Sequence, residues 1–158
     1  MSKKIDIQVI IGSKSDEPKI KGALEVLDEF GVPYDFKIAS AHRSPGYVEE
    51  VIDSAINRDV KIFITGAGMA NHLSGTVASR TILPVIGIPF SGGVSGGIDS
   101  LLSTVQMPPG VPVGTVAIDG SRNAAILALQ ILSLENKDLQ KKLIEFRHKE
   151  AEKIKNAF

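Results

Sequence analysis

The segment SAHRSP (residues 40–45) holds the side chains best suited to chemistry in this chain. His42 can accept or donate a proton near neutral pH, and Arg43 can donate two parallel hydrogen bonds to a phosphate. Ser44 and Pro45 are typical of the start of a helix. A lone histidine in a loop is usually structural, but the arginine and serines beside this one favour a site that moves a proton on a phosphate-bearing ligand.

The segment GSKSD (residues 12–16) offers a second set of polar groups. It follows an apolar run and precedes a pattern of helical period, so its backbone N–H groups would lie at the positive end of a helix dipole, where phosphates bind. Ser13 and Ser15 could add hydroxyl donors, and Asp16 could accept a hydrogen bond from a sugar hydroxyl. Ser15 and Asp16 could equally form only a helix cap and a turn, because the segment matches neither the Walker motif nor GxGxxG.

The segment GAGMANHLSG (residues 66–75) contains three glycines, which would let the main chain approach a flat ligand closely. His72 is its one titratable side chain. This histidine could contact a ligand, or it could lie in the first turn of a helix that buries Met69, Leu73 and Val77. The residue types do not separate these two interpretations.

Apolar runs of strand length alternate with stretches of helical period, which predicts a parallel sheet with helices on both faces. The expected fold class is therefore α/β, a three-layer αβα sandwich that forms a single domain over residues 1–158. Ligands of such folds bind at the carboxyl ends of the strands, where the strand order reverses. The expected strands are residues 7–11, 34–38, 60–65, 84–89 and 112–118, and the expected helices are residues 18–30, 45–56, 70–80, 98–106, 121–134 and 137–157.

The composition limits the kinds of partner and site. Eighteen Lys and Arg balance eighteen Asp and Glu, so no net charge attracts the chain to nucleic acid or to an anionic membrane. Cysteine is absent, and no apolar run approaches the roughly 20 residues of a membrane span. The N-terminal residues resemble a first strand rather than a secretion signal. We expect a cytoplasmic protein with no metal site, because no His, Asp or Glu set has ligand spacing.

Taken together, the three polar segments and GIDSLLSTVQMPPGVPVGTVAI (residues 97–118) resemble the N5-carboxyaminoimidazole ribonucleotide mutases of purine biosynthesis. The resemblance runs from residue 9 to residue 134 in order and without a large gap. It implies a flavodoxin-like fold with a five-stranded sheet, and a small-molecule substrate derived from aminoimidazole ribonucleotide. A related branch, the aminoimidazole ribonucleotide carboxylases, adds carbon dioxide directly to the same ring carbon.

The resemblance also implies roles for single residues. His42 would be the catalytic proton carrier: the N5 carbamate would release carbon dioxide in a closed site, C4 of the ring would attack it, and His42 would remove the C4 proton. No cofactor is implied for this step. The implied ligands of the ribose phosphate are Ser13, Asp16, Ser40 and Arg43, and the implied contacts to the imidazole and the carboxylate are Gly68, Ala70, His72 and Leu73.

Members of this family form assemblies of eight subunits with sites at subunit contacts, so the resemblance implies a homo-octamer. The expected last helix, residues 137–157, carries apolar side chains at helical spacing, among them Leu139, Leu143, Phe146 and Ile154. This stripe could pack on a neighbouring subunit, or it could cover the sheet of its own chain.

Some positions favour one branch of the family and some the other. Asn71 and the pair Ser74-Gly75 resemble the direct carboxylases. Arg43, His72 and VQMP (residues 105–108) resemble the mutases, which is the function we prefer from the sequence.

Two more distant functions are less favoured. A non-catalytic binding module of the same fold, such as a flavin carrier or a phospho-receiver, is disfavoured by the absence of tryptophan and by Thr65-Gly66 where a receiver needs an aspartate. A carboxylase of another heteroaromatic nucleotide, as in nickel-pincer cofactor synthesis, generally carries an extra N-terminal region that 158 residues do not accommodate.

Overall fold

A five-stranded parallel sheet lies at the centre of the computed structural model, which describes residues 4–157. Its order is β2-β1-β3-β4-β5, and each neighbouring pair is parallel, so the predicted α/β class is confirmed. The strands are β1 (Ile7–Ile11), β2 (Tyr34–Ile38), β3 (Ile62–Gly68), β4 (Val85–Phe90) and β5 (Gly114–Thr115).

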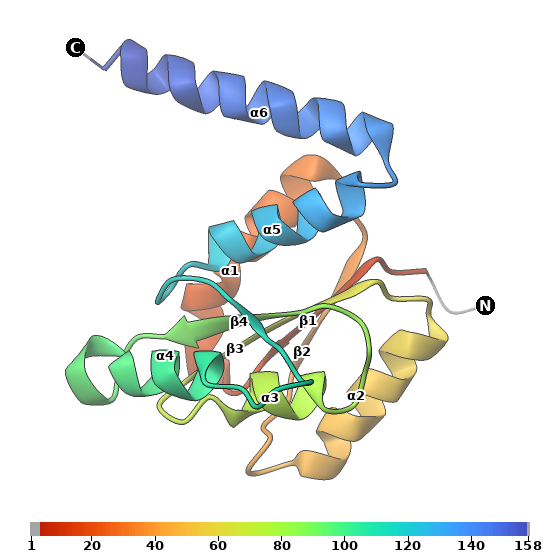
Figure 1. Ribbon diagram of the computed structural model, residues 1–158, viewed down its shortest axis with the longest axis vertical. Helices are drawn as coiled ribbons and strands as arrows, with labels where there is room; N and C mark the ends of the chain where they lie inside the picture. The colour runs from red at the N-terminus through yellow and green to blue at the C-terminus, as the bar shows by residue number, and fades with distance from the viewer. Residues whose placement is uncertain (1–3, 158) are drawn as a thin grey trace.

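Helices cover both faces of the sheet, as Figure 1 shows, and make the three layers expected. One face carries α1 (Glu17–Phe30) and α5 (Ser121–Ser133); the other carries α2 (Pro45–Asn57), α3 (His72–Ala78) and α4 (Ile98–Val105). Short 3-10 helices, η1 (Lys14–Asp16) and η2 (Val94–Gly96), lie in the loops after β1 and β4.

The inner strands are mostly apolar because both of their faces are covered, and their polar side chains, Gln8 and Thr65, are buried. Side chains alternate along β1: Ile7, Val9 and Ile11 pack in the core beneath α1 and α5, whereas Ile10 packs in the core beneath α2 and α3. Every residue of β1 and of β4 is buried, while the edge strand β2 is half-buried along its length. Two apolar cores thus hold the carboxyl ends of the strands in a fixed arrangement.

The fifth strand is much shorter than the run from 112 to 118 predicted, and only Gly114 and Thr115 pair with β4. Pro89 of β4 has no N–H group, so a regular ladder cannot continue past it. Isolated hydrogen bonds follow instead, from Val116 N to Gly87 O at 3.2 Å and from Asp119 N to Pro89 O at 2.9 Å. The chain stays beside β4 without forming a strand.

The last helix, α6 (Lys137–Lys155), packs on α5 near its start and projects beyond the body of the molecule at its end (Figure 1). Leu139 and Leu143 are buried in the core shared with α1 and α5, and the ring of Phe146 meets that of Phe30 edge-on. Ile154 is exposed. The first half of the stripe therefore covers its own chain. Within residues 4–157, no helix has the length and apolar character of a membrane span.

Candidate active site

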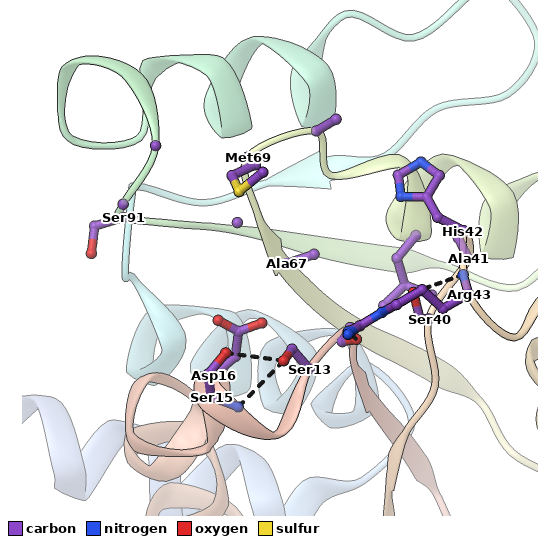
Figure 2. A pocket seen from close by; sticks show the side chains of 16 residues that line it. Ser13, Ser15, Asp16, Ser40, Ala41, His42, Arg43, Ala67, Met69 and Ser91 are labelled. Atoms are coloured by element: carbon purple, nitrogen blue, oxygen red, sulfur yellow. Dashed lines mark hydrogen bonds between the residues drawn. The ribbon is translucent and has the colours of Figure 1, made fainter.

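The loops that follow β1, β2, β3 and β4 meet at the carboxyl edge of the sheet, beside the point between β1 and β3 where the strand order reverses. They enclose a cavity of about 570 Å³. Figure 2 shows Ser13 and Asp16 on one side of it and Met69 on the opposite side. The lining residues are Gly12, Ser13, Ser15, Asp16, Ser40, Ala41, His42, Arg43, Ala67, Gly68, Met69, Ala70, Leu73, Ser91, Gly92 and Gly93.

The structure brings together nearly all residues singled out from the sequence. Those that line the cavity are Ser13, Asp16, Ser40, His42, Arg43, Gly68, Ala70 and Leu73. His72 does not line it, but its ring contacts that of His42, which does. Met69, which one interpretation placed in the core, is instead 65% exposed at the cavity.

Arg43 links the loop after β2, in which it lies, to the loop after β1. Its Nη2 donates a hydrogen bond to Gly12 O at 3.1 Å, so the guanidinium lies beside the backbone of the β1–η1 turn. The hydroxyl of Ser40 accepts from the backbone N–H of Arg43 at 3.1 Å and from its Nε at 3.4 Å. This side chain is therefore held against the loop of Ser13, with the remaining donors of its planar group available to an anion.

The β1–η1 turn presents hydroxyl groups at the start of two consecutive helices. Ser13 is the N-cap of η1 and accepts a hydrogen bond from Ser15 N at 3.4 Å, and the two serine hydroxyls are 3.0 Å apart. Asp16 occupies the N-cap position of α1, yet its side chain makes no capping hydrogen bond. The capping side chain is thus that of Ser13, whereas Ser15 and Asp16 were the residues expected to cap, and the carboxylate of Asp16 faces the cavity.

The carboxyl of Asp16 has a perturbed environment. Burial raises its pKa above the ordinary value, because water is partly removed from the charged form. The positive charges of Lys19 and Arg43 oppose this effect, and the negative charge of Asp119 adds to it. A perturbed carboxyl in a cleft is typical of a functional site.

His42 and His72 form a direct pair. His42 Nε2 lies 2.7 Å from His72 Nδ1, and the two rings meet edge to face with centroids 4.8 Å apart and planes at 77°. In this contact one nitrogen must carry the proton and the other must accept it. His42 lines the cavity and His72 does not, so His72 can orient the ring of His42 toward a ligand in the cavity.

Asn71 and Ser74, the positions that resemble the direct carboxylases, are completely buried and do not line the cavity. Asn71 caps α3, where its side-chain oxygen accepts from Ser74 N at 3.4 Å. Neither side chain is placed to contact a substrate. Their identity therefore says little about the carboxyl donor.

The glycine-dense segment after β4 supplies the part of the wall that was missed among the predicted site residues. Ser91, Gly92 and Gly93 line the cavity, and both glycines have positive φ. A Cβ atom at Gly93 would come within 2.4 Å of Asp99 Oδ2, so only glycine fits this turn. The four glycines between residues 92 and 97 are the signal in the sequence that could have found this wall.

Two neighbours fix the start of this wall. Asp119 Oδ1 accepts a hydrogen bond from Ser91 N at 2.9 Å, and Lys19 Nζ donates to Ser91 O.

Within residues 4–157 no three His, Asp or Glu side chains gather in a way that could hold a metal ion. The groups that line the site are thus an imidazole, a guanidinium, hydroxyls, a carboxylate and backbone groups of the loops.

Comparison with known proteins finds named relatives that align with most of this chain. A relative from Pyrococcus horikoshii, named N5-carboxyaminoimidazole ribonucleotide mutase, is 50% identical over 142 residues, which are 90% of this chain and 80% of the relative. A relative from Candida glabrata, named phosphoribosylaminoimidazole carboxylase, is 47% identical over 148 residues, which are 94% of this chain but 26% of that longer protein.

The fold also matches that of a solved structure. The crystal structure of Treponema denticola PurE superposes with a TM-score of 0.86 at 29% identity, covering 96% of this chain and 94% of the other. The profile of the AIR carboxylase family matches residues 6–153, which include every loop of the cavity. The chain therefore belongs to the AIR carboxylase family.

Proposed function

We propose that this protein is an N5-carboxyaminoimidazole ribonucleotide mutase, an isomerase of purine biosynthesis that moves a carboxylate from N5 to C4 of the imidazole. The observation that carries the proposal is one cavity in which His42 stands beside Arg43 and the Ser13 turn, in a chain 50% identical to a relative of that name. Residues 1–158 would act as a single catalytic domain, and the absence of cysteine favours the cytoplasm.

The phosphate of the substrate would bind between the first two loops. Arg43 supplies a fixed guanidinium there, and Ser13 and Ser40 supply hydroxyls on either side of it. Asp16 would accept hydrogen bonds from the ribose hydroxyls, since its carboxylate has no capping partner. The imidazole would then lie against the backbone of Gly68 and Ala70, above the side chain of Leu73.

In this arrangement His42 would serve both halves of the reaction. It would first donate a proton to N5 as the N–C bond of the carbamate breaks and carbon dioxide is released. The neutral imidazole of His42 would then accept the proton of C4 after that carbon forms its bond to carbon dioxide. The proton count closes without another acid or base, and the chemistry calls on no cofactor. A site sealed from water would keep the carbon dioxide beside C4.

Direct carboxylation of aminoimidazole ribonucleotide is the second candidate function. The relative from Candida glabrata bears a carboxylase name at 47% identity. The loop residues that favoured this branch, Asn71 and Ser74, are buried away from the cavity, which weakens the support they gave. We therefore rank the mutase first.

We further propose that the protein acts as a homo-octamer. Helix α4 exposes an apolar stripe at helical spacing, with Ile98, Leu102 and Val105 between 44% and 51% exposed. Exposed Val94 and Met69 precede this stripe in the chain, and Met69 lies at the cavity. Exposed apolar side chains on α4 and at the cavity favour a subunit contact that covers them.

The proposal is tested by offering two substrates to the purified protein and following the C4-carboxylated product. One reaction contains N5-carboxyaminoimidazole ribonucleotide alone, and the other contains aminoimidazole ribonucleotide with bicarbonate. A mutase converts the first rapidly and needs high bicarbonate for the second. Efficient use of the second with none of the first would establish the carboxylase, and no product from either would refute both functions.

A further inference from the structure

A buried polar network joins the first turn of α3 to the sheet and to α4. Its members are Thr65 of β3, Asn71 and Ser74 at the start of α3, and Thr104 of α4, and each is completely buried. Within residues 4–157 no buried side-chain nitrogen or oxygen lacks a hydrogen-bond partner. A fully satisfied network of this kind is rigid and fixes one arrangement of the elements that it joins.

Asn71 is the centre of this network. Its Nδ2 donates to Thr104 Oγ1 at 2.8 Å and to Ser74 Oγ at 3.0 Å, and its backbone N–H donates to Ser103 Oγ at 2.9 Å. Thr104 gives its own hydroxyl hydrogen to Ser100 O at 2.7 Å, so its oxygen is free to accept from Asn71. The amide of Asn71 therefore has a defined orientation.

The sheet is shaped to receive the same side chains. Thr65 Oγ1 donates to Ser74 Oγ at 2.8 Å, which holds α3 on β3. Gly87 of β4 leaves the space that the network fills, because a Cβ atom there would lie 2.6 Å from Thr104 Cγ2 and 3.0 Å from Ser74 Oγ. Three elements, β3, β4 and α4, thus determine where α3 begins.

The residue that follows Asn71 is His72, the first residue of α3 and the partner of His42 at 2.7 Å. A hydrogen bond between two ring nitrogens weakens steeply with distance and angle. A small shift of the first turn of α3 would therefore release the ring of His42, even though Asn71 itself does not line the cavity.

We propose that Asn71 is a positioning residue of the active site, which with Thr104 and Ser74 fixes the first turn of α3 so that His72 holds His42 in one orientation and one tautomer. The inference rests on the proposed function, in which His42 carries the proton. It gives Asn71 and Ser74 a task other than selection of the carboxyl donor.

The test removes the hydroxyl of Thr104 that accepts the hydrogen bond from Asn71, without leaving a cavity. Thr104→Val keeps the shape of the side chain and removes the hydroxyl, whereas Thr104→Ser keeps the hydroxyl. With N5-carboxyaminoimidazole ribonucleotide as substrate, Thr104→Val should lower kcat about tenfold, the effect of losing one orienting hydrogen bond, with KM unchanged. Thr104→Ser should restore kcat, because it restores the acceptor.

A measurement without substrate separates this role from the proposed function. The ¹⁵N chemical shifts of the histidine rings report which nitrogen carries the proton. The unmodified protein should show one dominant tautomer of His42, and Thr104→Val and Asn71→Ala should each show a mixture. If the unmodified protein converts neither substrate, the proposed function fails, but these spectra still decide the positioning role.

Unchanged tautomer populations and unchanged kcat in Thr104→Val would overturn the proposal, even if the melting temperature of the variant falls. Such a result would leave the network a purely structural support of α3. Should Asn71→Ala fail to fold, the shape-conserving Thr104→Val alone decides the matter.

Discussion

His42 Nε2 lies 2.7 Å from His72 Nδ1, a contact that joins the β2–α2 loop to the first residue of α3. A proton on one of these nitrogens requires a lone pair on the other, so the tautomers of the two rings are linked. Only His42 lines the cavity. The geometry therefore fits two separate roles, in which His42 carries the proton and His72 orients the ring of His42.

Replacing His42 by Asn removes the proposed proton carrier and leaves the proposed phosphate-binding groups in place. We expect kcat to fall by about 100-fold or more, the usual contribution of general acid and base catalysis, while substrate affinity changes little. Steady-state kinetics and calorimetric titration with the C4-carboxylated product measure the two effects. A His42→Asn enzyme that turns over at the normal rate would remove this residue from the mechanism.

His72→Asn provides the comparison, because an asparagine side chain can place a polar atom near the position of the histidine Nδ1. This variant should keep more of kcat than His72→Leu, which offers His42 no partner. Equal rates for both variants would show that the contact does not orient His42.

Replacing Arg43 by Ala removes the guanidinium that lies beside Gly12 O at 3.1 Å. A charge-assisted hydrogen bond to a phosphate contributes about 1.5 to 3 kcal/mol, so substrate affinity should fall roughly 10- to 150-fold. Arg43→Lys should recover part of the loss, because a point charge replaces the planar fork. Binding that stays as tight in Arg43→Ala as in the unmodified protein would place the phosphate elsewhere.

Asp16 should make stability depend on pH in an unusual direction. Burial raises the pKa of its carboxyl above the ordinary 3.8, so the ionised form destabilises the folded state at neutral pH. This cost is present above the folded-state pKa and disappears as the pH falls below the unfolded value. Asp16→Asn should therefore melt at a higher temperature than the unmodified protein at pH 7, with a gap that closes near pH 3.

Asp59 supplies a control of opposite sign. Its hydrogen bond to Lys61, at 2.7 Å, and the charge of that lysine lower the pKa of Asp59. The stabilisation is present above the unfolded pKa and is lost as the pH falls through the folded value. Relative to the unmodified protein, Asp59→Asn should therefore lose stability at pH 7 and regain it in acid. Melting curves of both variants that move in parallel with pH would contradict both assignments.

A charge in the exposed stripe of α4 should weaken self-association. Leu102 is 51% exposed in the single chain, and a glutamate there would be an unpaired charge at the proposed subunit contact. Burying such a charge costs several kcal/mol, so Leu102→Glu should associate at least about 100-fold more weakly. Light scattering after size exclusion measures the mass, with Leu102→Met as the apolar control. The same mass for both variants would place the contact on another surface.

Periodicity alone located most of the fold. The bounds of β1 and β2 agree with the expected strands because each is a short apolar or alternating run closed by turn residues. Of the strand expected from 112 to 118, only the two residues of β5 form a strand, because Pro89 on the neighbouring strand β4 has no N–H group to donate. The sequence alone does not show that Pro89 lies beside this distant segment.

The cavity was largely foreseen because parallel strands bring their carboxyl ends to one edge, where the polar loops must meet. The roles within the loops were harder to foresee. Asn71 and Ser74 resemble the direct carboxylases in the sequence, yet their side chains point into a buried network that includes Thr104, 33 residues from Asn71 in the chain. Which side of a loop faces the ligand depends on such long-range contacts.

In the proposed function, the carboxylate moves from N5 to C4 within one closed site. The most direct test supplies N5-carboxyaminoimidazole ribonucleotide with a ¹³C-labelled carboxylate in a large excess of unlabelled bicarbonate, and measures ¹³C in the product by mass spectrometry. We expect the product to keep the label, because the carbon dioxide would not leave the site before C4 attacks it. A product whose carboxylate matches the unlabelled bicarbonate pool would contradict transfer within a closed site.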